Sequence, residues 1–212
     1  MVLFGQQQKE EAEKLFLKTI KLQEKLWAEN PQVHSADLAR SYINLGVLYH
    51  ESKRYPQAEE MHRKAIAIKE QLYVNNEKKI APELLKNYNG LGIICEAGGH
   101  PERAEEAYLK VIAICESIAD KNSDEYAGYL VVAYSNMGIL YCDAEKFTEA
   151  EKMCEKLVEI SEKLYPGEPE KYHGYLKGAY NMLCYAYSKL GKMDEAREVY
   201  DKFQAIQAEG EE

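Results

Sequence analysis

A spacing of 46 residues runs through the sequence and limits the fold more than any other feature. An aromatic, a large apolar residue, a small residue and a second aromatic return at this interval, with cysteine replacing one member in two of the copies. The four copies are Tyr42, Leu45, Gly46 and Tyr49; Tyr88, Leu91, Gly92 and Cys95; Tyr134, Met137, Gly138 and Tyr141; and Tyr180, Leu183, Cys184 and Tyr187. Self-similarity at a fixed period of about 20–50 residues is typical of proteins built from stacked repeats.

The residue types within one period predict two packed helices. Tyr42, Leu45 and Tyr49 follow one another at steps of three and four, which places them on one face of a helix. Gly46 lies inside that helix, where glycine costs about 1 kcal/mol relative to alanine. The glycine returns in the next two repeats, so we expect a second helix to cross closely there. That second helix carries small residues at matching positions: Ala58, Ala104, Ala150 and Ala196.

This pattern resembles the tetratricopeptide repeat, whose first helix carries an aromatic, Leu-Gly and Tyr, and whose second helix carries spaced alanines and an aromatic. The usual repeat has about 34 residues, whereas this one has 46. The longer form, LARSYINLGVLY followed by YPQAEEMHRKAIAIKEQLY, is similar to the repeats of kinesin light chains. Residues that depart from the family pattern are Cys184 for glycine, Cys95 for tyrosine, and His62 and Cys154 for the second-helix aromatic.

The resemblance implies an all-α, right-handed α-solenoid of antiparallel helix pairs. We expect one N-terminal helix and four repeats of 46 residues within a single repeat domain, 1–212. By register the N-terminal helix corresponds to the second helix of a repeat. The expected bounds are 6–27 for this half repeat and about 35–74, 82–119, 124–165 and 172–207 for the four repeats, with Pro82 opening the first helix of the second.

The charge balance restricts the classes of partner. The chain has 27 lysines and arginines against 36 aspartates and glutamates, a net charge of −9. This argues against a nucleic-acid partner, which needs a basic face, and against an anionic membrane surface. The sequence has no apolar run near the ~18 residues of a spanning helix, and MVLFGQQQKE does not have the pattern of a signal peptide. We therefore expect a cytoplasmic protein.

The sequence contains no catalytic pattern. It has no glycine-rich phosphate loop, HExxH or GxSxG, and its five histidines stand at unrelated positions of the repeats. We expect no enzyme, no cofactor and no metal. Five cysteines without a CxxC pair fit a reducing compartment. Cys95, Cys154 and Cys184 stand at core positions, where free cysteine acts as a small apolar residue, while Cys142 lies near the exposed end of a first helix.

In tetratricopeptide arrays the first helices line a concave groove that holds extended peptides or helices of partner proteins. The resemblance therefore implies a peptide-binding groove on the first-helix side that faces away from the core. By register that side carries Arg40, Ile43, Asn44, Val47, His50 and Glu51; Lys86, Asn89, Gly90, Ile93, Glu96 and Ala97; Val132, Ser135, Asn136, Ile139, Cys142 and Asp143; and Gly178, Asn181, Met182, Tyr185, Ser188 and Lys189.

Three features of this side indicate binding. Each repeat has an asparagine, whose amide suits a peptide backbone but could equally bond to neighbouring helices; these are Asn44, Asn89, Asn136 and Asn181. One register holds an apolar strip, which either meets the ligand or is buried between adjacent first helices; it consists of Val47, Ile93, Ile139 and Tyr185. Arg40 and Lys86 suggest a basic rim in the first two repeats.

The two-carboxylate clamp of some tetratricopeptide co-chaperones is not expected, because Val47, Ile93 and Ile139 occupy places that it would fill with polar groups. The hypothesis that we favour is that the chain is a protein-interaction module that binds a peptide or helical segment. Two alternatives are a peptide-sensing regulatory domain of a signalling protein and a self-assembly unit, a homo-oligomer formed through the unpaired N-terminal helix.

Overall fold

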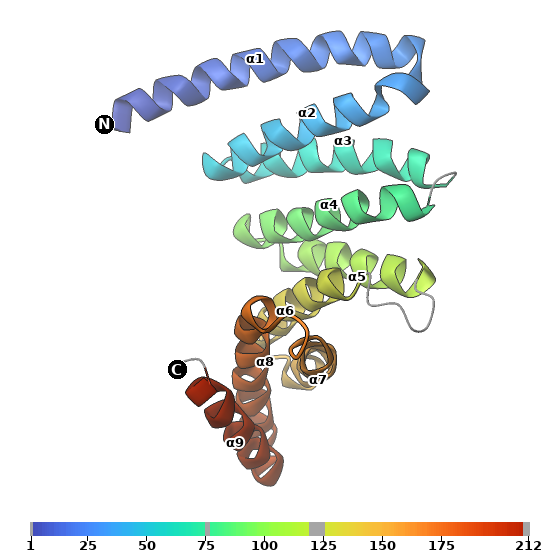
Figure 1. Ribbon diagram of the computed structural model, residues 1–212. Coiled ribbons are helices and arrows are strands. Elements are labelled where there is room, and N and C mark those ends of the chain that lie inside the picture. Colours follow the sequence, from blue (N-terminus) through green and yellow to red (C-terminus); the bar gives the residue numbers. More distant parts are fainter. Residues whose placement is uncertain (1, 75–76, 119–125, 210–212) are drawn as a thin grey trace. The chain divides into compact units, whose positions relative to one another are not determined.

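The computed structural model describes residues 2–74, 77–118 and 126–209, and over these ranges it contains nine helices and no strand (Figure 1). The helices are α1 (Val2–Glu29), α2 (Pro31–Glu51), α3 (Tyr55–Tyr73), α4 (Glu77–Ala97), α5 (Pro101–Ile118), α6 (Ala127–Asp143), α7 (Phe147–Leu164), α8 (Pro169–Leu190) and α9 (Met193–Glu209). This confirms the all-α class of paired repeat helices. Among the helices described, none has the length and apolar content needed to cross a membrane.

The chain divides into two compact units, Met1–Ala107 and Tyr108–Glu212, called unit 1 and unit 2 below. In unit 1, α1 packs on α2, α2 on α3 and α3 on α4, each running back along the one before it (Figure 1). In unit 2, α6 packs on α7, α7 on α8 and α8 on α9, and the two first helices α6 and α8 also touch. The assignment of all repeats to a single domain stays a prediction.

The helix crossing expected at the repeated glycine is present in both units. In unit 1, a Cβ atom added to Gly46 of α2 would lie 2.6 Å from Cδ2 of His62 on α3. In unit 2, a Cβ atom on Gly138 of α6 would lie 3.1 Å from Sγ of Cys154 on α7. The second helix therefore packs directly on the first-helix backbone, and glycine is kept because a side chain would collide.

Several helices begin earlier than the sequence predicted. The expectation that Pro82 opens a helix is wrong, since α4 begins at Glu77 and Pro82 lies inside it. The extra turn places Ala81 in the core with no exposed surface, which offsets the hydrogen bond that proline cannot donate. Helices α2 and α8 begin at Pro31 and Pro169, where proline at the first position loses no helical hydrogen bond.

The cysteines are all free thiols. Cys95 and Cys154 have no exposed surface, as their core positions predicted, and burial raises the pKa of the Cys95 thiol to about 11. Cys184 is only half-buried, with its Sγ 3.4 Å from the carbonyl oxygen of Ala196. Cys142 is half-buried as well, and burial raises its pKa, so its thiol is less readily ionised than that of an exposed cysteine.

The first aromatic of the repeat has a second role that the pattern did not reveal. Its hydroxyl donates a hydrogen bond to a glutamate 18 residues earlier, on the second helix of the preceding repeat. The pairs are Tyr42 with Glu24, Tyr88 with Glu70 and Tyr180 with Glu162. Each bond therefore ties one repeat to the next.

We expect Tyr180→Phe to lower the free energy of unfolding by about 1–2 kcal/mol, because it removes a hydrogen bond to a charged carboxylate and leaves the ring in place. The hydroxyl of Tyr180 lies 2.6 Å from Oε1 of Glu162. Tyr134→Phe is the matched control in the same unit, because its hydroxyl has no hydrogen bond to the residues that the structure describes. Urea unfolding followed by circular dichroism measures both, and equal losses would show that the bond contributes nothing.

Candidate functional site

By register, the expected groove residues lie on one side of the first helices, which are α2 and α4 in unit 1 and α6 and α8 in unit 2. We call this side the first-helix surface. The exposed residues are Arg40, Asn44, Val47, Lys86, Ile93, Ile139, Asn181 and Tyr185. Asn136 is half-buried and Asn89 is buried. Eight of the ten residues predicted for the site are therefore accessible to a ligand.

The apolar strip is exposed. Val47 and Ile93 in unit 1 are each 44% exposed, and Ile139 and Tyr185 in unit 2 are 43% and 47% exposed. Burial between adjacent first helices, the alternative that the sequence left open, does not occur at these positions. One register of the repeat therefore presents a large apolar side chain to solvent on each of the four first helices.

The four asparagines do not form a single exposed row, which corrects the sequence prediction. Asn44 and Asn136 share one register, whereas Asn89 and Asn181 stand one residue earlier in the repeat. One residue is a rotation of about 100° around a helix. Asn89 is only 7% exposed, and its Oδ1 has no hydrogen-bond partner within the described structure. Of the four asparagines, only Asn44 and Asn181 have side chains that are exposed to solvent.

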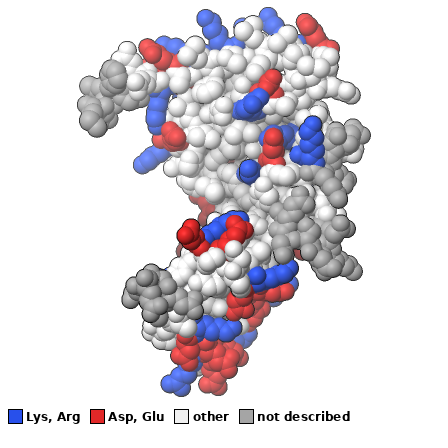
Figure 2. Space-filling model, in the orientation of Figure 1, with Lys and Arg blue, Asp and Glu red and all other residues white. Residues whose placement is uncertain are grey.

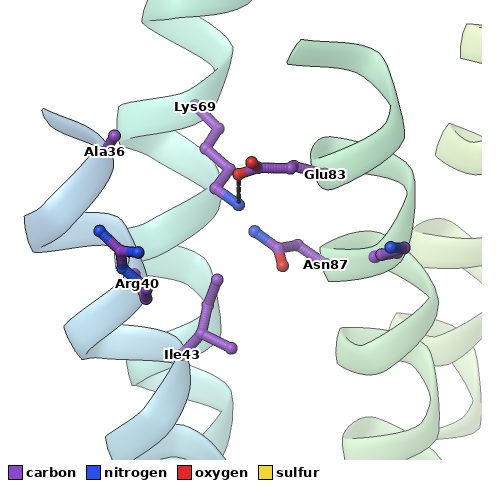
Figure 3. A pocket seen from close by; sticks show the side chains of 7 residues that line it. Ala36, Arg40, Ile43, Lys69, Glu83 and Asn87 are labelled. Atoms are coloured by element: carbon purple, nitrogen blue, oxygen red, sulfur yellow. Dashed lines mark ion pairs between the residues drawn. The ribbon is translucent and has the colours of Figure 1, made fainter. Parts of the chain in front are cut away.

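A pocket of about 290 Å³ opens on the first-helix surface of unit 1, between α2, α3 and α4 (Figure 3). It brings together Arg40 and Lys86, the two residues predicted as a basic rim. The residues that line it are Ala36, Arg40, Ile43, Lys69, Glu83, Lys86 and Asn87. Lys69, Glu83 and Asn87 were not predicted as site residues.

The pocket is rich in positive charge and in hydrogen-bond donors. Lys69 is nearly buried, and its Nζ lies 2.7 Å from Oε2 of Glu83. The hydrogen bond from Lys69 lowers the pKa of the Glu83 carboxyl, and the charges of Arg40 and Lys86 add to the shift. Asn87 is 5% exposed, and its Nδ2 has no acceptor among the residues described. Figure 3 shows this amide nitrogen directed toward the space beside Lys69.

The sequence did contain a signal for two of the missed residues. Lys69 stands at the register of Cys115 and Ser161, both fully buried. Asn87 stands at the register of Ala133 and Ala179, which also have no exposed surface. A charged or amide side chain at a core register is costly unless it has a polar partner, so both residues marked the junction of the first and second repeats as unusual.

A second pocket, of about 340 Å³, lies on the first-helix surface of unit 2 and is lined by Ile139, Cys142, Asp143, Asn181, Met182 and Tyr185. The register analysis had placed all six on this side. The ring of Tyr185 packs edge-on against Phe147, with 5.7 Å between the ring centroids. The ammonium group of Lys189 lies 5.3 Å from the centroid of Tyr185. The ring of Tyr185 therefore contacts Phe147 and Lys189 at the edge of the pocket.

The charges on the molecular surface do not form one basic face in the view of Figure 2. Basic and acidic side chains are intermingled over unit 1, and acidic side chains gather where α8 and α9 lie. The basic character of the unit 1 pocket is therefore a local feature of a chain with a net charge of −9.

Comparison with known families matches three separate segments of the chain. Residues 1–71, 130–169 and 178–209 each match a model described as a tetratricopeptide repeat. Together these segments take in about two thirds of the sequence. A search of curated proteins gave no match.

Several solved structures have a similar fold. The nearly identical TPR-like repeats of a Podosopora anserina kinesin light chain are 22% identical, with a TM-score of 0.68, and the match covers 98% of this chain and 90% of that one. MamA is 18% identical with a TM-score of 0.58, covering 95% and 94%. The apo form of RapI is 17% identical with a TM-score of 0.68, covering 91% of this chain and 49% of RapI. At these identities the likeness concerns the fold alone.

Proposed function

The chain belongs to the tetratricopeptide-repeat family, and on this premise we propose that it is a non-catalytic protein-interaction module whose ligand, a peptide or helical segment of a partner protein, binds to the first-helix surface. One observation carries the proposal, namely the apolar residue that each first helix exposes at the same register. Exposed apolar side chains that recur in this way mark interaction surfaces, and packing within either unit does not explain them.

The two pockets suggest which chemical groups of a ligand would be recognised. In unit 2, the pocket that contains Ile139 and Tyr185 offers apolar surface beside the free amide of Asn181. In unit 1, the pocket that contains Arg40, Lys86 and the unpaired amide of Asn87 suits a carboxylate. The expected ligand therefore carries large apolar side chains and at least one acidic side chain.

We expect Ile93→Asp to weaken binding of the partner at least about tenfold, or 1.4 kcal/mol, because a charge would meet an apolar part of the ligand. The partner is first captured with the wild-type chain and purified, and its affinity is then measured by isothermal titration calorimetry. Leu109→Asp is the matched control, since Leu109 is 47% exposed on α5, a second helix. Loss of affinity in the control but not in Ile93→Asp would place the ligand on the second helices.

We expect Lys86→Glu to reduce affinity for the same partner several-fold at low salt and to make binding less sensitive to salt, because it removes one favourable charge contact and adds a repulsive one. Lys110→Glu, an exposed lysine of α5, is the control for the change in net charge. Equal losses in the two variants would mean that the pocket has no specific role and that only total charge matters.

A further inference from the structure

Helix α1 carries an exposed line of leucines that the first-helix surface does not include. Leu15, Leu22 and Leu26 are 66%, 61% and 43% exposed. Their spacing of seven and then four residues puts them on one side of the helix, and we call this line the α1 leucine stripe. A different side of α1 packs on α2, through the buried Ile20 and the half-buried Phe16 and Trp27. The α1 leucine stripe is therefore an apolar face separate from the core.

The next repeat shows what kind of element covers this face. Adding 46 residues to the α1 leucine stripe gives Met61, Ile68 and Leu72 of α3. Met61 and Ile68 are only 8% and 6% exposed. The Cβ of Met61 faces Gly46 of α2, where an added Cβ would lie 3.3 Å away. On α3 this face is therefore covered by a helix that packs alongside it, and α1 offers an equivalent apolar face with no described helix on it.

A line of lysines borders the α1 leucine stripe. The four lysines are exposed and recur at steps of four, three and four residues, which aligns them along the helix next to the leucines; they are Lys14, Lys18, Lys21 and Lys25. None of them forms an ion pair with a residue that the structure describes. The acidic residues nearest this line in register, Glu10, Glu11 and Glu29, lie at its two ends. An apolar stripe with one basic edge is an unusual feature in a chain with a net charge of −9.

We propose that this face of α1 is a second docking surface, which binds an amphipathic helix of a partner protein whose apolar stripe is flanked by aspartate or glutamate. The partner helix would pack on the α1 leucine stripe as α2 packs on the equivalent face of α3, and the lysine line selects acidic flanks. This surface is independent of the first-helix surface, so it goes beyond the function proposed above.

A second copy of the chain fits this face less well. Two copies that meet through their α1 leucine stripes with the helices antiparallel are related by a two-fold axis perpendicular to the helices, so the same edge of each helix faces its counterpart. The lysine line of one copy would then lie beside the lysine line of the other, and like charges at that spacing repel. The charge pattern therefore favours an acidic partner helix over antiparallel self-pairing of α1.

The test uses two synthetic helical peptides that share a leucine stripe and differ only in their flanking residues, glutamate in one and lysine in the other. We expect the glutamate peptide to bind the full chain at least tenfold more tightly by fluorescence anisotropy, and added salt to weaken it. Leu22→Asp should reduce this binding at least tenfold without changing the melting temperature, because Leu22 is exposed. Lys18→Glu combined with Lys25→Glu should abolish the preference between the peptides, because the line would then carry two positive and two negative charges.

The controls separate this surface from the first-helix surface. Leu109→Asp and Ile93→Asp should both bind the glutamate peptide as the wild type does, so failure of one proposal leaves the other standing. Equal binding of the two peptides, or full binding by Leu22→Asp, would overturn the proposal. A dimer that sediments as such at micromolar concentration and is lost in Leu22→Asp would also overturn it, because the occupant would then be a second copy.

Discussion

Replacing Gly46 with leucine is expected to destabilise unit 1 by about 3 kcal/mol, the upper part of the usual range for overpacking. An added Cβ would lie 2.6 Å from Cδ2 and 3.0 Å from Nε2 of His62. The imidazole ring cannot easily move aside, because it is 5% exposed and a Cβ on Gly90 of α4 would lie 3.3 Å from its Cε1. Urea unfolding monitored by circular dichroism measures the loss.

Two further variants show whether the collision is the cause. Gly178→Leu makes the same change inside α8, where an added Cβ meets no atom within 4 Å, and it should be neutral or stabilising because leucine favours helix more than glycine does. Truncating the neighbour in the double variant Gly46→Leu with His62→Ala should recover part of the loss. If Gly46→Leu were as stable as Gly178→Leu, the close crossing of α2 and α3 would be misplaced.

The second large effect concerns pH. Burial lowers the pKa of His62 to about 4, from an ordinary value of 6.5. The backbone of Asn87 opposes the shift in part, but neither ring nitrogen reaches hydrogen-bond geometry with any described residue. When the chain unfolds, the imidazole recovers its ordinary pKa and binds a proton that the folded state excludes. Unfolding is therefore favoured as the pH falls from about 6.5 to about 4, by about 3 kcal/mol in total at roughly 1.4 kcal/mol per pKa unit.

The expected measurement is the free energy of unfolding of the wild type and of His62→Leu between pH 7.5 and pH 4. Carboxylates titrate in both proteins, so their contributions cancel in the difference. The difference should move steadily in favour of the leucine variant below pH 6.5, since leucine has no proton to bind. A difference that stays constant with pH would show that His62 is solvated or hydrogen-bonded in the folded protein.

The repeat register was enough to predict the helices and their pairing, and it identified the apolar strip but left open whether the strip is exposed. These follow from local periodicity and from the side on which each residue falls. The register also contained a signal for the hydrogen bonds between tyrosine and glutamate that tie the repeats together. Glu24, Glu70, Glu116 and Glu162 recur at the same 46-residue interval as the tyrosines, and three of the four accept the tyrosine hydroxyl.

The register could not predict how side chains at equivalent positions differ in burial. Asn89 and Asn181 share a register, yet Asn89 is buried and Asn181 is exposed, because the residues packed around them differ between repeats. The unit 1 pocket depends in the same way on contacts between three helices. Lys69 reaches Glu83 across the space between α3 and α4, and this pairing is not encoded by either helix alone.

The most direct test of the proposed function is photo-crosslinking from single positions of the folded chain. A photoreactive amino acid is placed at Val47, Ile93 or Tyr185 on the first-helix surface, and at Leu109 on a second helix, all of which are between 44% and 47% exposed. The proposal predicts that a purified partner is crosslinked efficiently from the three first-helix positions and only weakly from Leu109. Efficient crosslinking from Leu109, with none from Val47, Ile93 or Tyr185, would contradict it.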